Sequence, residues 1–505
     1  MTDAGTTPRP GGRPHRQVTP ADTIWLNMDR PNNLMIIDSV MLFDEPVDWG
    51  RLRDVLQRRL VERFPVFSQR AVDPSIPLGL PHWEDDPDFD LDRHLVRAQL
   101  PGPGDDAALQ HYIEAQLPRP LDRSRPLWEY HFIDGYGAGC AVLARFHHAL
   151  ADGAALMEVL LSTTDATPDG DLRPDAVAPR PPQDEHLDGL AAILGAAAKV
   201  AGTVAHSATS AAQGAFHLLE ELPHLASRSS ALVDALGLSQ ATGQVAGKLL
   251  TVHNPRSPLS GVPVPAKRVI WTAPHPLEGI KLAGRPAGAT VNDVILSVLA
   301  AALARYQADR GADPVDLVTM VPVNLRAPGE PLPKELGNRF ALVFLELPSG
   351  EHPPLERLAL AKQRMDQIKH SPEAVITFGL IQAIGRTNPD LERMLVDFFS
   401  NKAFGVTTNV AGPRQPRYMA GTPMTGVLGW VPGSGHHSLG ICILTYAEHL
   451  RVGFKADAAV VPDPEKLVLA FDECLNELLD LTSPSGPRPR RAAAAKTPRR
   501  RATGT

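Results

Sequence analysis

The chain contains little cysteine and no long apolar run. Its three cysteines, Cys140, Cys442 and Cys474, lie far apart in 505 residues and form no Cys-x-x-Cys pair. The sequence therefore predicts neither a disulfide framework nor a zinc site, and no metal or cofactor is expected. No uninterrupted apolar run approaches the roughly 20 residues of a membrane span, so any membrane contact is expected to be peripheral. A reducing cytoplasm suits such a chain best.

Aromatic residues make up only 5% of the chain, and its formal net charge is −7. So few aromatic side chains give no stacking platform for single-stranded nucleic acid, which excludes that class of partner. Basic residues cluster only in the tail, from Arg488 to Arg501, and no acidic residue follows Asp480. This tail is predicted to be disordered and to attract the anionic headgroups of a membrane or lipid droplet, with nucleic acid or acidic partners as the alternatives.

Length and composition predict two lobes. The chain is 43% hydrophobic, and 505 residues exceed what one core usually supports. The Pro- and Asp-rich stretch from Thr163 to Glu185 indicates an exposed linker, and the Ala-rich stretch from Leu187 to Leu250 indicates one or two long helices. The expected divisions are a disordered N-terminus at 1–15, an N-terminal lobe at 16–165, a linker and helical crossover at 166–265, a C-terminal lobe at 266–483 and a disordered basic tail at 484–505.

Strand and helix patterns alternate along the chain, which predicts an α/β fold. In the first lobe a strand is expected to begin at Trp128, to turn at Asp134-Gly135 and to return over Cys140–Phe146, before a helix over Ala154–Leu161. In the second lobe the expected elements are strands at Val269–Thr272, Leu317–Val323 and Phe340–Leu347, helices from Asn292 to Tyr306 and from Leu355 to Lys369, a hairpin of Leu439–Tyr446 with Leu450–Lys455, and a closing helix from Pro464 to Leu481.

The seven residues His147-His148-Ala149-Leu150-Ala151-Asp152-Gly153 carry the clearest chemical signal. A neutral imidazole can take the proton of an alcohol that attacks an activated acyl carbon. No serine nucleophile is then required, and the chain contains no Gly-x-Ser-x-Gly motif. Because successive side chains of a strand point to opposite faces, at most one of the two imidazoles is expected to face a given pocket. Taken alone, the pair fits a buried structural role as well as catalysis.

Asp152 follows the histidines at the start of the expected helix. It is predicted either to hold the loop through a salt bridge, with an arginine from elsewhere in the chain, or to cap the helix. Both roles are structural. A second adjacent pair, His436-His437, has no Asp-Gly after it and no third ligand at metal spacing, so a loop before the closing hairpin is expected there.

Several motifs together resemble one family, the bacterial bifunctional wax ester synthase/diacylglycerol acyltransferase family. The resemblance covers roughly Thr19 to Leu481, and the order and spacing of its motifs agree. The motifs are Thr19-Pro20-Ala21-Asp22 through Asp29-Arg30-Pro31, Pro81-His82-Trp83, Asp88-Phe89-Asp90-Leu91, Pro126-Leu127-Trp128, the His147–Gly153 stretch, Asn292-Asp293-Val294 and Thr408-Asn409-Val410-Ala411-Gly412-Pro413. Thr408, Ala411 and the pair Ala154-Ala155 depart mildly from the family pattern, which bears on substrate preference.

The resemblance implies a fold of two chloramphenicol acetyltransferase-like lobes, with mixed sheets and helices and an active-site tunnel at their interface. It implies that His148 is the general base, beside His147 and Asp152, and that Asn292 helps to place the reacting groups or to polarise the carbonyl. Gly153, Asp293 and Asn409 would support the site, and Pro126, Leu127 and Trp128 would line the tunnel. The residues themselves offer another interpretation of Asn292-Asp293: Thr290 as cap and Asp293 in the first turn of a helix.

The function implied is acyl transfer from acyl-CoA, a substrate and not a cofactor, to diacylglycerol, with long-chain alcohols as further acceptors. A long acyl chain gains about 0.8 kcal/mol for each buried methylene, so a tunnel of aliphatic side chains is expected. Two alternatives stay open: an acyltransferase for a different hydroxyl, such as that of a polyketide or sugar, and a non-catalytic lipid-binding or droplet-associated protein. The Leu187–Gly202 helix fits an interlobe crossover better than a membrane-surface helix, because Lys199 is its only strong base.

Overall fold

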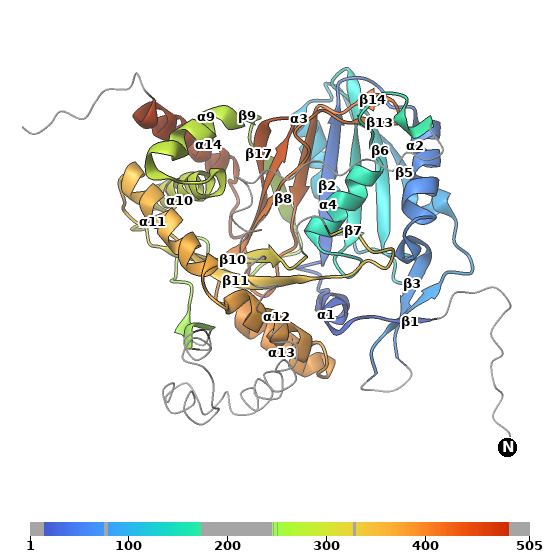
Figure 1. Ribbon diagram of the computed structural model, residues 1–505, viewed down its shortest axis with the longest axis horizontal. Helices are drawn as coiled ribbons and strands as arrows, with labels where there is room; N and C mark the ends of the chain where they lie inside the picture. The colour runs from blue at the N-terminus through green and yellow to red at the C-terminus, as the bar shows by residue number, and fades with distance from the viewer. Residues whose placement is uncertain are drawn as a thin grey trace, which may run out of the picture.

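The computed structural model describes residues 15–74, 79–172, 245, 247–249, 251–326 and 330–483. Two sheet-rich lobes lie side by side, with the N-terminal lobe on the right and the C-terminal lobe on the left of Figure 1. The predicted helices between Leu187 and Leu250 fall almost wholly outside the described residues. The predicted disordered N-terminus, apart from His15, and the basic tail at 484–505 lie outside them as well.

The N-terminal lobe is built on a five-stranded mixed sheet. Its strand order is β15 (Gly426–Trp430), β2 (Ile36–Phe43), β7 (Gly139–His147), β6 (Trp128–Tyr136) and β5 (Leu95–Gln99), of which only β5 and β6 are parallel neighbours. Every residue of β7 is buried, because apolar clusters cover both faces of this sheet. The near-continuous apolar sequence of β7 follows from that two-sided burial.

The predicted hairpin of this lobe forms, but its turn lies later than expected. The strands β6 and β7 pair antiparallel and turn at Gly137 and Ala138, whereas the sequence indicated Asp134-Gly135. A register shift between Asp134 and Tyr136 places a bulge at the earlier position. Gly135 has a φ of +79° there, so the glycine that indicated a turn is needed for a bulge instead.

Helices and short strands complete the N-terminal lobe. A small sheet of order β1-β4-β3 lies at its edge. The bounds of these elements are β1 Arg16–Gln17, α1 Pro20–Met28, α2 Trp49–Leu56, β3 Gln69–Val72, β4 His82–Asp85, α3 Asp106–Gln116 and α4 Gly153–Ser162.

The C-terminal lobe has a mixed sheet of order β11-β10-β12-β16-β17-β8, and β9 (His275–Pro276) pairs with β17 beside it. The strands are β8 Lys267–Trp271, β10 Leu317–Asn324, β11 Phe340–Leu347, β12 Gly405–Val410, β16 Leu439–Tyr446 and β17 His449–Asp457. The helices α9 (Leu277–Gly284), α10 (Val291–Asp309), α11 (Pro354–Lys369) and α14 (Glu465–Thr482) lie on the outer side of this sheet (Figure 1). Each strand and helix predicted for this lobe is confirmed to within a few residues.

The two lobes share elements that the sequence did not indicate. Strand β15 belongs to the C-terminal half of the chain, yet it pairs antiparallel with β2 of the first lobe. Helix α1 of the first lobe packs against α12 (Glu373–Ile384) and α13 (Pro389–Ser400) of the second. A further apolar cluster joins α3 to Val269 and Trp271 of β8. The lobes are therefore held together by a strand from the C-terminal half that joins the sheet of the first lobe, as well as by surface contact.

One helix pair has the length and composition of a membrane span, but it is sharply bent. Within the described ranges no single helix is long and apolar enough to cross a bilayer, and the segments Leu277–Ala287 and Val291–Asp309 meet at 94°. Most of α10 is buried in the core of the C-terminal lobe. Burial inside a protein core accounts for its apolar sequence.

Candidate active site

The His147–Gly153 motif forms the junction between β7 and α4. Strand β7 ends at His147, and α4 begins at Gly153. Asp152 is the residue before the helix, and its Oδ1 accepts a hydrogen bond of 2.9 Å from the Ala155 amide. A carboxylate at this position satisfies one of the free amides of a helix start. The motif therefore folds as the strand, turn and helix that the sequence predicted.

His147 is held on both ring nitrogens. Its Nε2 lies 3.0 Å from Asp29 Oδ2, and its Nδ1 accepts a hydrogen bond of 3.1 Å from the Ala149 amide. Because Nδ1 accepts, Nε2 carries the proton and donates to Asp29. Burial acts to raise the pKa of Asp29, but the hydrogen bonds from His147 and from the Met35 amide, together with the charge of Arg123, outweigh it and lower that pKa. The buried His147 thus fixes the geometry of the turn.

His148 is the histidine of the pair whose ring is available to a substrate. It lies in the turn after β7, so the unequal roles of the two histidines come from the turn and not from strand pleating as predicted. Its ring is stacked on Trp25 with centroids 4.1 Å apart, and Phe340 of the other lobe lies 5.6 Å away. The side chain is partly exposed, yet Nδ1 is buried and has no hydrogen-bond partner among the described residues. Only Nε2 can then meet a substrate.

The surroundings of His148 keep its ring neutral. Burial lowers the pKa of His148 to about 4, and the charge of Asp152 opposes that shift only partly. An imidazole with this pKa is unprotonated at neutral pH and ready to accept a proton. Asp152 favours the imidazolium that would form during proton transfer.

A hydrogen-bonded chain from both lobes holds the backbone of His148. The His148 amide donates to Met35 O at 2.7 Å, and its carbonyl accepts from Asn338 Nδ2 at 2.7 Å. The backbone and side-chain amides of Asn338 both donate to Asp22 Oδ1, at 2.8 Å each. Burial raises the pKa of Asp22 to about 6, although the hydrogen bonds from Asn338 act to lower it. Trp25 and Asp22 both belong to α1, which therefore braces the ring and the backbone of His148.

Asp152 also joins the two lobes. Its Oδ2 accepts hydrogen bonds from Arg326 Nη1 at 2.5 Å and from the Arg339 amide at 2.9 Å. Arg326 also donates to Gly337 O at 2.6 Å. The side chains of Asp152 and Arg326 are 5% and 8% exposed, so the ion pair is buried. Both structural roles predicted for Asp152 are present together.

Asn292 and Asn409 contact each other but do not hydrogen-bond to the histidines within the described ranges. Asn409 Nδ2 donates to Asn292 Oδ1 at 2.9 Å. Asp293 forms the predicted capping box with Thr290 at the start of α10, which confirms its structural role. A Cβ added at Gly153 would meet nothing within 4 Å, so packing does not explain that glycine. The contribution of Asn292 to the reaction stays a prediction.

Trp128 and its neighbours lie in the apolar core of the N-terminal lobe. Trp128 is fully buried, its Nε1 donates to Phe67 O at 2.8 Å, and it stacks on His94 at 4.5 Å. Leu127 is buried too, and its carbonyl accepts a hydrogen bond from the His147 amide. Pro126 is also buried. These contacts support the motif from behind, and a role as tunnel wall stays a prediction.

Several residues that contact the motif were given no role from sequence, among them Trp25, Asp29, Arg326 and Asn338. Trp25 and Asp29 lie within the N-terminal segment that resembles the family, but nothing in the segment indicates that it packs against His147 and His148. Arg326 and Asn338 lie more than 170 residues after the motif, where no local pattern distinguishes them.

Comparisons with known proteins place the chain in a family. Residues 18–295 match the model of the wax ester synthase/diacylglycerol acyltransferase catalytic domain, and residues 336–479 match the C-terminal domain model of that family. A probable diacylglycerol O-acyltransferase of Mycobacterium tuberculosis (strain ATCC 25618 / H37Rv) is 27% identical over 82% of this chain and 85% of its own length.

Solved structures share the fold. The wax ester synthase/diacylglycerol acyltransferase of Marinobacter aquaeolei VT8 is similar with a TM-score of 0.63 and 21% identity, covering 92% of this chain and 99% of that one. The starter condensation domain of rhizomide synthetase, in complex with C8-CoA and Leu-SNAC, is similar with a TM-score of 0.54 and 16% identity, covering 93% of this chain and 94% of that one. The predicted two-lobed acyltransferase fold is confirmed. Because the catalytic-domain model alone matches more than half of the residues, the chain belongs to the wax ester synthase/diacylglycerol acyltransferase family.

Proposed function

We propose that this protein transfers a long-chain acyl group from acyl-CoA to the free hydroxyl of diacylglycerol, and that long-chain alcohols are further acceptors. The observation that carries the proposal is the state of His148: a neutral ring, braced by Trp25, with only Nε2 available to a substrate. Relatives named as diacylglycerol O-acyltransferases and a structural neighbour that binds C8-CoA support the choice of substrates.

The chemistry needs one base and no covalent enzyme intermediate. The hydroxyl oxygen of the acceptor attacks the thioester carbon while its proton passes to Nε2 of His148. The tetrahedral intermediate collapses, the carbon–sulfur bond breaks, and the proton on Nε2 passes to the departing CoA sulfur. The ester and CoA leave, and His148 is neutral again. Asp152 favours the transient imidazolium by its charge.

The acceptor is tested by thiol release from palmitoyl-CoA with the purified full-length protein. We expect release to depend on added diacylglycerol or hexadecanol, with triacylglycerol or wax ester identified as the lipid product. A protein that acylates another hydroxyl would leave both lipids unchanged and release thiol with its own acceptor. A non-catalytic lipid-binding protein would release no thiol with any acceptor. Either result would overturn the proposal.

The pKa of His148 predicts a flat pH dependence over the physiological range. Because burial lowers that pKa to about 4, the base is already neutral at pH 6. The kcat/KM of the free enzyme should therefore stay constant between about pH 6 and 9 as far as His148 is concerned, and should fall only as pH approaches 4. An exposed histidine with an ordinary pKa of about 6.5 would instead give tenfold less activity one pH unit below that value.

Asp22 provides the control for that measurement. Its pKa of about 6 places a second titration near the lower end of the range, and Asn338 links it to the backbone of His148. An inflection of kcat/KM near pH 6 that comes from Asp22 should be absent in the Asp22→Asn variant, because an asparagine side chain cannot ionise. An inflection near pH 6.5 that persists in this variant would assign an ordinary pKa to the base and contradict the prediction.

A further inference from the structure

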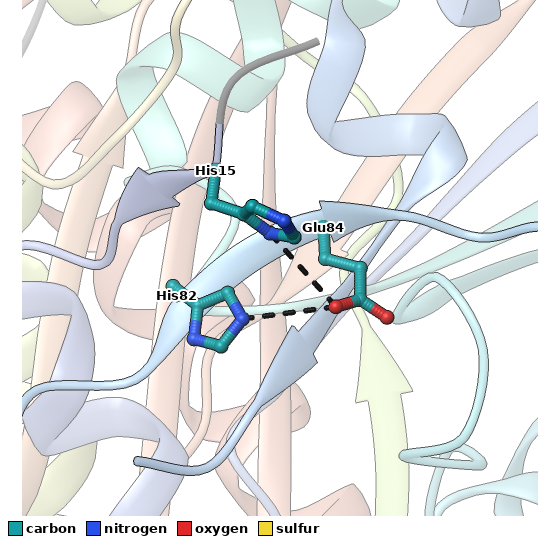
Figure 2. Close-up of side chains that lie close together, drawn as sticks. All are labelled: His15, His82 and Glu84. Carbon is teal, nitrogen blue, oxygen red and sulfur yellow. Dashed lines mark ion pairs between the residues drawn. The ribbon is translucent and has the colours of Figure 1, made fainter. Parts of the chain in front are cut away.

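Three ligand-capable side chains meet at the edge of the N-terminal lobe, away from the acyl-transfer motif. In the small sheet, Arg16 pairs with Trp83 and Gln17 pairs with His82. Continuing that register places His15 opposite Glu84. Since alternate residues of a strand face the same side, His82 and Glu84 share one face with His15, while Trp83 points the other way and is buried. Figure 2 shows the two imidazoles and the carboxylate turned toward one another.

The distances within this cluster are close to those of a metal site. Oε2 of Glu84 lies 3.9 Å from His15 Nδ1 and 3.7 Å from His82 Nε2. One ligand atom from each residue lies within 4.8 Å of the other two. Zinc binds histidine nitrogen and carboxylate oxygen at about 2.0–2.2 Å in tetrahedral geometry, which separates neighbouring ligand atoms by about 3.3–3.5 Å. Small side-chain rotations would bring all three atoms to that separation.

These contacts are too long to be hydrogen bonds. Donor–acceptor distances of about 2.7–3.2 Å are normal for such bonds, and both imidazole–carboxylate separations exceed them. The rings of His15 and His82 meet edge to face with centroids 5.1 Å apart, so they do not bond to each other either. Glu84 Oε2 therefore forms only long ion pairs with the two histidines. A cation at the point where the three atoms converge would bind all of them more closely.

Arg70 orients the carboxylate of Glu84. Its Nη2 donates to Glu84 Oε1 at 2.5 Å, which leaves Oε2 to face the two histidines. An outer partner that fixes a ligating side chain is a regular feature of metal sites.

We infer that His15, His82 and Glu84 form a binding site for a divalent transition-metal ion, zinc above others, with the fourth position open to water. Two imidazoles and one carboxylate are a ligand set that zinc accepts, and no cysteine is needed. Because the proposed site contains no cysteine, the cysteine pattern of the sequence could not reveal it.

The bound ion would tie the N-terminal strand to β4. His15 directly precedes β1, and α1 begins at Pro20. The ion would therefore fix the chain five residues before the helix that contributes Asp22 and Trp25 to the surroundings of His148. The site is separate from the acyl-transfer reaction and does not depend on the proposed substrates.

The test measures zinc binding by the untagged full-length protein in competition with a chromogenic chelator. We expect one zinc ion per chain at this site, and at least tenfold weaker binding in His15→Ala, His82→Ala and Glu84→Gln. His111→Ala, which removes an exposed histidine of α3, is the matched control and should bind like the wild type. Circular dichroism checks that each variant is folded.

Cobalt absorption gives a second readout of the same site. Co²⁺ bound by two nitrogens and one oxygen in tetrahedral geometry should give visible absorption bands in the wild type and in His111→Ala, and these bands should be lost in His82→Ala. Zinc should also raise the Tm of the wild type and leave that of His82→Ala unchanged. The decisive variant is the double replacement His15→Ala/His82→Ala. The inference is overturned if this variant binds zinc with the wild-type stoichiometry and with an affinity within tenfold of the wild type.

Discussion

Replacing His148 with alanine should reduce ester formation from acyl-CoA by about 10²- to 10⁴-fold, the usual contribution of a positioned general base. The loss should appear in kcat, because the imidazole takes part in proton transfer and the variant keeps the surfaces that bind the acyl chain. Folding should be preserved, since the ring is partly exposed and its removal leaves the backbone hydrogen bonds to Met35 and Asn338 in place. The measurement is single-turnover transfer from palmitoyl-CoA, with circular dichroism and Tm recorded on the same samples.

The second histidine pair of the chain offers a matched control. His436 is exposed and lies in a loop before β16, next to a buried histidine, as His148 does. His436→Ala should transfer acyl groups at the wild-type rate. A His148→Ala protein that is folded and keeps more than a tenth of the wild-type rate would contradict the role of general base.

Local patterns predicted much of the fold. The strand before His147, the helix after Asp152 and the capping box of Thr290 and Asp293 each depend on residues within about ten positions. Apolar runs, apolar residues at helical spacing and cap residues determine such elements directly. The strands and helices predicted for the C-terminal lobe formed for the same reason.

Contacts between distant segments could not be predicted in this way. Strand β15 pairs with β2 across almost 400 residues of chain, and Arg326 and Asn338 reach the motif from the other lobe. Such pairings depend on how complete helices and strands pack against one another. No periodicity in a single sequence indicates that packing. The predicted turn of the β6–β7 hairpin was misplaced because Gly135 lies in a bulge. A glycine within a strand pattern can indicate either a bulge or a turn.

Both lobes hold the motif in place. His148 lies between Trp25 of the first lobe and Phe340 of the second. Its carbonyl is bonded to Asn338, and Asp152 is bonded to Arg326, both from the second lobe. Proton transfer requires the base to be positioned within a fraction of an ångström. The relative placement of the lobes is therefore part of the site.

Removing the Asp152 carboxylate should lower the free energy of unfolding by about 3–5 kcal/mol, the usual cost of leaving one member of a buried ion pair without its partner. In Asp152→Ala, Arg326 stays 8% exposed without a counter-charge, and the amides of Ala155 and Arg339 lose their acceptor. Activity should fall with stability, because the same contact joins the lobes around His148. Urea denaturation followed by tryptophan fluorescence gives the free energy.

Further variants separate the ion pair from the helix cap. Asp152→Asn keeps one oxygen for the Ala155 amide, but it loses the charge and the Oδ2 acceptor of Arg326 and of the Arg339 amide. It should therefore retain only the roughly 1 kcal/mol contributed by the cap. In the double variant Asp152→Ala/Arg326→Met the unpaired charge is gone, so the loss should be smaller than the sum of the two single losses.

The exposed pair of Arg53 and Asp92 is the matched control for burial. Its side chains are 41% and 61% exposed, and Asp92→Ala should cost no more than about 1 kcal/mol, because water screens and replaces such a contact. The difference between the two aspartate variants isolates the effect of burial. Equal losses at Asp152 and Asp92 would mean that the interlobe pair is solvated in solution, and the coupling between lobe placement and the His148 site would then have to come from Phe340 and Asn338.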